Sequence, residues 1–452
     1  MLQRTTTACL CLAIFLVLGC ENEKVPAPFK PRNDHEAYEH SLEEANLLST
    51  ALGADWQKSA QTSLESPIKI SSPYEEAIYI DEKEAVALGY QFSAKRGQKI
   101  QVNVERMSQN DAKTFVDLFR IDEHSKLRHV ATADSEELLL GFEPRRDAIY
   151  VLRFQPELLR GGEFKITIQN VPTLRFPVAG KTDKAIGSFW GAPRDGGRRK
   201  HEGVDIFAAR GTPIIAPTDG YVRTAGKRGI GGNVVWLYDS KRSQSLYFAH
   251  LNKILVKKGD RINAGDTLGT VGNTGNARTT PPHLHFGIYK NGATDPLNHL
   301  KATGKRLKRV GGDLSYLGEE IRVNRSTSIS KDVEGRQSIR IAKNQIARAI
   351  GTTASHYRIE LPNGQEGYIR KNLISDLDRS LERLYARDHG VLLKSPDRRA
   401  YLTDVDANDQ LFVLGKNRDF WLVENDAGQK GWITNNYKNS SRSRRSYSDT
   451  PR

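Results

Sequence analysis

The chain has 452 residues, of which 38% are hydrophobic, with a formal charge of +14 and a mean hydropathy of −0.57. This length and polarity exclude a single large apolar core and favour two to four small domains. The 38 glycines and 18 prolines, together with many β-branched residues, indicate β structure joined by turns. The basic balance suits a polyanionic partner. However, there is no nucleic-acid-binding motif and the basic residues are spread along the chain, so no nucleic-acid partner is expected.

Residues 1–20 have the pattern of a signal peptide. Arg4 supplies the positive start, and an apolar run from Ala8 to Leu18 is too short to span a membrane comfortably. The run ends in "VLGC", which resembles a bacterial lipoprotein signal that is cleaved before Cys20. The resemblance implies that the Cys20 thiol and the new amino group carry lipid. An ordinary secretory signal is the alternative.

The residues around the expected cleavage site also bear on location and metal chemistry. In lipoproteins of this type, Glu21 after the cysteine is similar to the outer-membrane pattern, which implies an envelope protein facing the periplasm and held to the membrane by its lipid. Cys9 and Cys11 would leave with the signal. The mature chain would then have no disulfide within it and no thiolate metal site, so histidine and carboxylate side chains must hold any metal ion.

Residues 21–66 are expected to form a tether followed by a helix. The stretch "ENEKVPAPFKPRN" contains three prolines among charged residues, as in a flexible linker. Residues 34–62 then carry apolar side chains at helical spacing, which predicts a helix packed against a core. These side chains are Tyr38, Leu42, Ala45, Leu48, Leu52 and Trp56.

Residues 67–172 change to short alternating runs such as "QKIQVNVER" and "EFKITIQN", separated by polar turns. This pattern predicts a β-sandwich. The segment resembles the small jelly-roll-like modules that accompany secreted peptidases. His124 and His129 lie in it without evident partners and are expected on the surface.

The C-terminal part contains an internal repeat after a linker at 301–318. Residues 350–369 and 414–433 align without a gap at an offset of 64 residues, and Tyr357 and Tyr368 match Trp421 and Trp432. Both units resemble bacterial SH3-like barrels and are placed at 319–376 and 377–440. Residues 441–452 are basic and rich in serine, which predicts a disordered tail. The chain as a whole is therefore predicted to be mainly β and multidomain.

Between these parts, residues 173–300 carry a constellation of histidines. The stretch "PPHLHFGIY" reads as a strand, on which His283 and His285 share one face. If "HEGVD" is also extended, His201 and Asp205 share a face because they are four residues apart. In "SLYFAHL", the same alternation places His250 on the face of two apolar residues. Taken alone, such histidines are equally compatible with the wet face of a sheet.

Two histidines and one aspartate meet the need of a zinc site that takes three protein ligands and leaves a place for water. Such a site makes a water molecule acidic, and two further histidines could move protons and stabilise an oxyanion. The sequence has no HExxH motif, so no helical glutamate is available as the base.

The stretches in this region resemble, in order, the lysostaphin/LytM-type zinc endopeptidases that cut peptidoglycan cross-bridges. The resemblance covers about 185–297 and includes the lead-in "GSFWGAPRDGGRRKHEGVD". Its other motifs are "GTPIIAPTDGYV", "YFAHL", "VKKGDRINAGDTLGTVGNTG" and "HLHFGIY". It implies a mostly antiparallel sheet of the duplicated hybrid motif fold, with a narrow groove.

Carried over by motif, His201, Asp205 and His285 match the zinc ligands, and His250 and His283 match the two active-site histidines that do not bind the metal. Glu202 and His299 match no role and are expected to be exposed.

The resemblance implies a Zn²⁺-dependent endopeptidase acting on the peptide stems and cross-bridges of peptidoglycan. The alternative is a non-catalytic LytM-type protein that recruits or activates another cell-wall hydrolase. A β-rich adhesion or sugar-binding lipoprotein is a third reading, which leaves the five residues unexplained.

Overall fold

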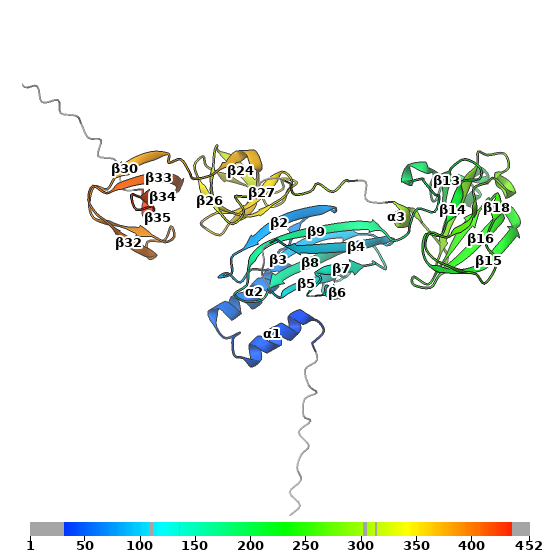
Figure 1. Cartoon of the computed structure of the whole chain (residues 1–452), viewed down its shortest axis with the longest axis horizontal. Helices are drawn as coiled ribbons and strands as arrows, with labels where there is room; N and C mark the ends of the chain where they lie inside the picture. The colour runs from blue at the N-terminus through cyan, green and yellow to red at the C-terminus, as the bar shows by residue number, and fades with distance from the viewer. Residues whose placement is uncertain (1–30, 108–111, 135, 302–304, 312–313, 436–452) are drawn as a thin grey trace, which may run out of the picture.

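The computed structural model shows a chain built mainly of β-sheets, which confirms the predicted fold class. In Figure 1 a β-sandwich occupies the middle, residues 173–300 lie at one end and the repeat units at the other. Within the part of the chain described, no helix has the length and apolar character needed to cross a membrane. The signal peptide, Cys20 and the tail at 441–452 lie outside the described residues, which are 31–107, 112–134, 136–301, 305–311 and 314–435.

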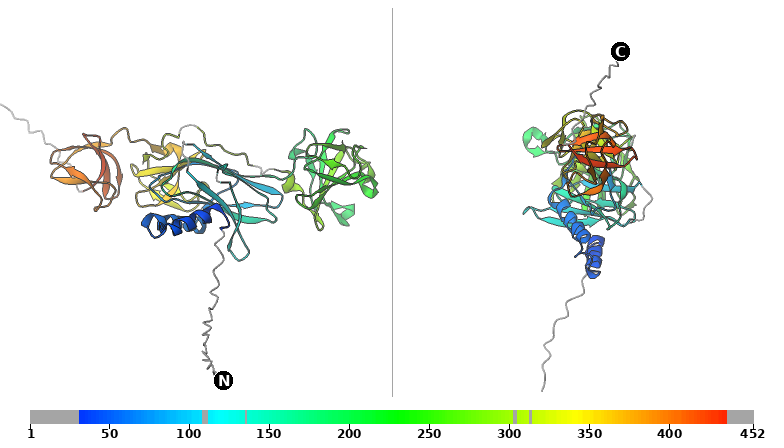
Figure 2. Two further views of the ribbon diagram at one scale, coloured as in Figure 1. Left: turned by 60° about the horizontal axis from the view of Figure 1, so that its bottom comes forward. Right: turned by 90° about the vertical axis from the view of Figure 1, so that its left-hand side faces the viewer.

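Two helices precede the sandwich, where the sequence predicted one continuous helix over residues 34–62. They are α1 (Asp34–Glu44) and α2 (Ala51–Glu65). The break falls at Asn46, whose φ of 57° is a left-handed conformation that an α-helix does not accept. Trp56 is fully buried, stacks on His35 and donates from Nε1 to Pro156 O of the sandwich at 2.9 Å, so the helices pack against the sandwich along its lower face in Figure 2.

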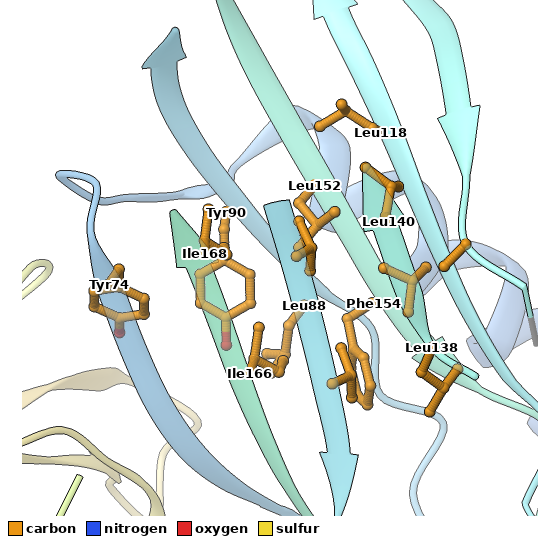
Figure 3. Close-up of a cluster of buried hydrophobic side chains, with 14 of the residues drawn as sticks. Tyr74, Leu88, Tyr90, Leu118, Leu138, Leu140, Leu152, Phe154, Ile166 and Ile168 are labelled. Carbon is orange, nitrogen blue, oxygen red and sulfur yellow. The ribbon is translucent and has the colours of Figure 1, made fainter. Parts of the chain in front are cut away.

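The sandwich consists of two facing antiparallel sheets, apart from one short parallel edge pairing, and Figure 3 shows the side chains between them. Alternation along the strands directs every second residue inward, as Ile100, Val102 and Val104 show. One sheet contains, in order, β1 (Ile68–Lys69), β3 (Leu88–Ala94), β8 (Ala148–Pro156), β5 (Thr114–Ile121) and β6 (Leu127–Thr132). The other contains β2 (Tyr74–Ile80), β9 (Gly162–Pro172), β4 (Gln98–Arg106) and β7 (Leu139–Phe142).

The second sheet does not stop at the edge of the sandwich. Strand β2 pairs with β26 (Ile346–Thr352) of the first repeat unit, with Ala77 opposite Thr352 and Ile78 opposite Gly351. One sheet of 11 strands therefore runs through both parts. This pairing occupies backbone groups that an isolated repeat unit would expose at its edge.

The two repeat units share a strand plan at the offset seen in the sequence. Strand β27 (His356–Glu360) corresponds to β34 (Phe420–Asn425), and β28 (Glu366–Arg370) to β35 (Lys430–Thr434). The other strands of the first unit are β23 (Glu320–Val323), β24 (Thr327–Ser330), β25 (Ser338–Ile341) and β29 (Ile374–Ser375), with the turn η5 (Lys371–Leu373). Those of the second unit are β30 (Glu382–Tyr385), β31 (Gly390–Leu393), β32 (Tyr401–Val405) and β33 (Gln410–Asn417).

The matched aromatic residues of the repeat are mainly core. Tyr357, Tyr368 and Trp432 are buried, and Trp421 is half-buried beneath Lys416, whose Nζ lies 4.5 Å from the ring centre. These rings stabilise the small units and leave little aromatic surface for a ligand.

Residues 173–300 form an eight-stranded antiparallel sheet backed by a smaller one. The large sheet contains β10 (Ile186–Ser188), β13 (Val204–Phe207), β21 (His283–Tyr289), β17 (Gln244–Ala249), β16 (Gly232–Asp239), β15 (Gly220–Arg228), β19 (Arg261–Ile262) and β22 (Ala293–Thr294). The small sheet contains β14 (Pro213–Ile215), β20 (Thr267–Thr270) and β18 (Lys253–Ile254). The connections include the hairpin β11 (Pro193–Arg194) and β12 (Arg199–Lys200), the helix α3 (Leu297–Leu300), and the turns η1 (Asp183–Ala185), η2 (Asp195–Gly197), η3 (Gly229–Gly231) and η4 (Gly275–Ala277).

Two histidines differ from the sequence expectation. His299 is not exposed: it is 5% accessible and hydrogen-bonds through Nδ1 to Thr173 Oγ1 at 2.8 Å, where α3 meets the end of β9. His129 is not an isolated surface residue, because its Nε2 lies 3.2 Å from the buried Asp117 carboxylate and 2.9 Å from Thr132 Oγ1. The partner of His299 is distant in sequence, whereas those of His129 lie on the neighbouring strand and in its own strand.

Candidate active site

Strands β13 and β21 bring Asp205 and His285 together as direct cross-strand neighbours. His201 joins them from the segment before β13 and is not part of that strand, contrary to the extended reading of "HEGVD". Its backbone is held by a hydrogen bond from its N–H to Ala192 O at 2.8 Å. The three side chains converge: His201 Nε2 lies 3.0 Å from both Asp205 Oδ1 and His285 Nδ1, and the last two atoms are 3.1 Å apart.

Gly203 makes this convergence possible. A Cβ at this position would lie 2.5 Å from Phe286 O and 2.8 Å from Cε1 of His285, closer than real side chains approach. The glycine in "HEGVD" is therefore required because the imidazole of His285 passes directly against the backbone between the other two donors.

The donor atoms fit a metal ion. His201 Nδ1–H donates to Phe189 O at 2.9 Å, which leaves the lone pair of Nε2 directed at the other two donors. Ligands about 2.0–2.1 Å from a tetrahedral zinc lie roughly 3.4 Å apart, close to the separations found here. These three residues form the group of histidine and carboxylate side chains, among those described, whose donor atoms lie within 4.8 Å of one another.

Electrostatics favour the metal-binding protonation states. Burial alone would raise the pKa of Asp205, but the adjacent imidazoles of His201 and His285 hold it well below the usual range for a carboxyl. Burial lowers the pKa of His285. A charged carboxylate and neutral imidazoles are the forms that bind divalent metals.

His250 reaches the same site by a different route from the one predicted. Strand alternation would have directed it into the core with Leu246 and Phe248, but β17 ends at Ala249 and His250 has a φ of 66°. This left-handed conformation is unusual for a side-chain-bearing residue and turns the imidazole to the opposite face of the sheet. It is held by a hydrogen bond from the backbone N–H of His250 to Gly231 O at 2.8 Å.

His250 and His283 both present Nε2 to the site. Nδ1–H of His250 donates to Thr274 O at 2.8 Å, and Nδ1–H of His283 donates to Pro281 O at 2.9 Å. The two rings are 5.1 Å apart, and His283 Nε2 is 4.0 Å from Asp205 Oδ1. Burial lowers the pKa of His250 to about 4, so its Nε2 is an acceptor at neutral pH.

All five residues line one cavity of about 820 Å³. Every residue described around it belongs to 188–289, so neither the sandwich nor the repeat units contribute to its walls. Glu202 lies at its edge and is exposed, as predicted.

An aromatic wall of this cavity was not among the predicted features. Trp236, Tyr247 and Tyr289 contact one another, with ring centres 4.5 Å apart for Trp236 and Tyr247 and 5.0 Å apart for Trp236 and Tyr289. Tyr289 could have been found, because it shares the period-two face of the paired histidines. The other two depend on strand pairings that the sequence does not reveal.

Three converging nitrogen and oxygen donors, with two further histidines facing the same cavity, are the arrangement found in metal-dependent hydrolases. The family model for "Peptidase family M23" matches residues 199–297. These residues are therefore an M23 peptidase domain, homologous to the lysostaphin/LytM-type peptidoglycan endopeptidases, which confirms the resemblance seen in the sequence.

Individual relatives match the same region. The L-Ala–D-Glu endopeptidase of Bacillus subtilis is 41% identical over 140 residues, which are 28% of this chain and 43% of that protein. Peptidoglycan DD-endopeptidase ShyC of Vibrio cholerae is 40% identical over 119 residues, 25% of this chain and 27% of that protein. The solved catalytic domain of lysostaphin from Staphylococcus simulans is 36% identical, with a TM-score of 0.23, and the match covers 24% of this chain and 86% of that one. This chain thus spans less than half the length of these two curated relatives.

Proposed function

We propose that this protein is a zinc-dependent endopeptidase that hydrolyses peptide bonds in the stems and cross-links of bacterial peptidoglycan. The observation that carries the proposal is the convergence of His201, Asp205 and His285 beside His250 and His283 in one cavity. The names of the relatives support the substrate class, since one is a peptidoglycan DD-endopeptidase and the other an L-Ala–D-Glu endopeptidase.

The metal would be held by His201 Nε2, Asp205 Oδ1 and His285 Nδ1. When bound, zinc supplies Lewis-acid chemistry, which polarises an amide carbonyl and makes a water molecule acidic. The hydrogen bond from His201 to Phe189 O fixes the tautomer of that ligand.

His250 and His283 provide the proton transfers. Each has its Nδ1–H committed to a backbone carbonyl, so each Nε2 is left to face the substrate. A neutral Nε2 accepts a proton from the attacking water, and the resulting imidazolium donates it to the leaving amine. While the imidazolium carries this proton, its Nε2–H also stabilises the negative charge that develops on the carbonyl oxygen. The half-buried rings of Trp236, Tyr247 and Tyr289 give the substrate an apolar wall beside these groups.

We further propose that the chain is a lipoprotein anchored through Cys20 at the outer membrane and facing the periplasm. The "VLGC" stretch and Glu21 support this location. The two C-terminal units, by their resemblance to SH3-like barrels, would hold the enzyme near the wall, where two weak modules raise the effective concentration.

The alternative of a non-catalytic protein that recruits another hydrolase is not favoured. A binding protein of this type needs no metal, yet here the three donors converge and both further histidines are present with their tautomers fixed.

Digestion of purified peptidoglycan with the zinc-loaded protein, followed by mass spectrometry of the products, tests the proposal. We expect new peptide termini, sensitivity to a chelator, and restoration by added zinc. Intact peptide stems and cross-links after prolonged digestion would overturn it, and the masses of the products identify the bond.

A further inference from the structure

A guanidinium contacts one of the three donor residues. Arg194, on β11, donates from Nη2 to Asp205 Oδ2 at 2.7 Å and to Ser188 Oγ at 2.7 Å. Its side chain is 32% exposed and lines the cavity, whereas the Asp205 side chain is 11% exposed.

The two oxygens of Asp205 are thus divided between different partners. Oδ1 faces His201 and His285, and Oδ2 receives Arg194. Because a carboxylate is planar, fixing Oδ2 also fixes the direction in which Oδ1 points.

Ser188 connects this contact to a second donor. It is the cross-strand partner of Asp205 on β10, and its Oγ lies 3.4 Å from His201 Nδ1. The next residue, Phe189, accepts the hydrogen bond from the same Nδ1. The short segment 188–194 therefore contacts two of the three donor residues.

We propose that Arg194 is a positioning residue of the metal centre: it orients the Asp205 carboxylate so that Oδ1 is presented to the metal together with His201 and His285. The inference rests on the proposed function only in that it takes zinc to be the ion. Partners of this kind around a ligand change metal affinity by about 10–100-fold when they are lost. An arginine suits the task better than a lysine, since its planar fork can bond a carboxylate and a hydroxyl in fixed directions.

The test measures zinc binding directly. Zinc is titrated into the metal-free full-length protein in competition with a chromophoric chelator, for wild type, Arg194→Gln, Arg194→Lys and Arg210→Gln. Arg210 is a matched control, because it bonds Asn273 Oδ1 on the surface and does not line the cavity. We expect Arg194→Gln to weaken zinc binding about 10–100-fold, Arg194→Lys to recover part of the loss, and Arg210→Gln to bind like wild type.

Cobalt substitution provides a readout that general destabilisation would not move. The visible spectrum of the Co²⁺-loaded Arg194→Gln protein should differ from that of wild type, because the Asp205 oxygen is less firmly held. Methylguanidinium added to this variant should raise its zinc affinity. If Arg194→Gln proves poorly folded by circular dichroism, Ser188→Ala tests the same support from the other side and should weaken zinc binding several-fold.

Zinc affinity of the folded Arg194→Gln protein within twofold of wild type, with an unchanged cobalt spectrum, would overturn the proposal. That outcome is separate from failure of the proposed function, which would appear as a wild-type protein that binds zinc and cuts no peptidoglycan.

Discussion

The Glu76 carboxylate lies 2.9 Å from Nε of Arg358, and the two side chains are 0% and 3% exposed. Glu76 belongs to β2 of the sandwich and Arg358 to β27 of the first repeat unit. Hydroxyls of Tyr90 and Tyr368 complete the hydrogen bonding of the carboxylate. The sandwich and the first repeat unit are therefore joined both by a shared sheet and by a buried ion pair.

Replacement of one member of this pair should be strongly destabilising. Arg358→Met leaves the Glu76 carboxylate buried without its counter-ion, which costs about 3–5 kcal/mol of the free energy of unfolding. Urea unfolding of the full-length chain measures it. Arg336→Met is the control, since the Arg336 side chain of its ion pair with Asp332 is exposed and screened by solvent, so its loss should have a much smaller effect. Equal effects of the two substitutions would contradict the coupling.

The shared sheet dictates where the chain can be shortened. Truncation after residue 376 removes only the second repeat unit, and we expect hydrolysis of short soluble muropeptides to stay near wild type while binding to sacculi weakens. Truncation after Leu300 also removes β26 and Arg358, so it should destabilise the sandwich. Sedimentation with sacculi and hydrolysis of soluble fragments, measured in one buffer, separate the two effects. If the chain ending at 376 loses sacculus binding and hydrolysis of soluble fragments to the same extent, the second unit supports the fold or the groove of the peptidase domain instead of binding the wall.

Acid should destabilise the helical layer through His35. Burial, followed by the positive charge of Arg153, lowers the pKa of His35 to about 4 from 6.5. Between pH 6.5 and pH 4, His35 therefore binds a proton in the unfolded chain but not in the folded chain. The free energy of unfolding falls as the pH drops through this range. The contribution is about 3 kcal/mol at most. Denaturant unfolding of wild type and His35→Phe between pH 7 and pH 4 measures it. The substituted protein should show a shallower decline, and identical slopes would refute the assignment.

Membrane association should depend on one sulfur atom. Cys20 is the single cysteine that remains after the expected cleavage, so Cys20→Ser removes the site for lipid and should yield unprocessed or soluble protein. Partitioning into detergent and the mass of the N-terminal peptide measure the change. Unaltered partitioning of Cys20→Ser would contradict the lipoprotein proposal.

The sequence predicts much of the site because its chemistry depends on local spacing. His283 and His285 share a strand face, and "HEGVD" places His201 near Asp205 whichever backbone it adopts. The orientation of His250 could not be predicted, since it depends on a left-handed residue stabilised by Gly231 of η3 and by Thr274 just before η4. Likewise, Arg194 is visible in the lead-in motif, but its contact with Asp205 needs the folded hairpin.

The fold shows the same division. Alternation predicted the β-rich class, because it reports on faces of single strands. The pairing of β2 with β26 joins segments about 270 residues apart, and no local pattern encodes it. The burial of His299 against Thr173 likewise depends on a contact between segments far apart in the sequence.

The most direct test of the proposed metal centre compares zinc content and peptidoglycan hydrolysis in His285→Ala and His283→Ala. His285→Ala removes one of three donors, so it should lose zinc and activity together. His283→Ala should keep one zinc per chain, because its Nε2 lies outside the donor group, while turnover falls about 10²–10³-fold. Zinc lost from His283→Ala and kept by His285→Ala would contradict the assignment of the two histidines and the mechanism built on it.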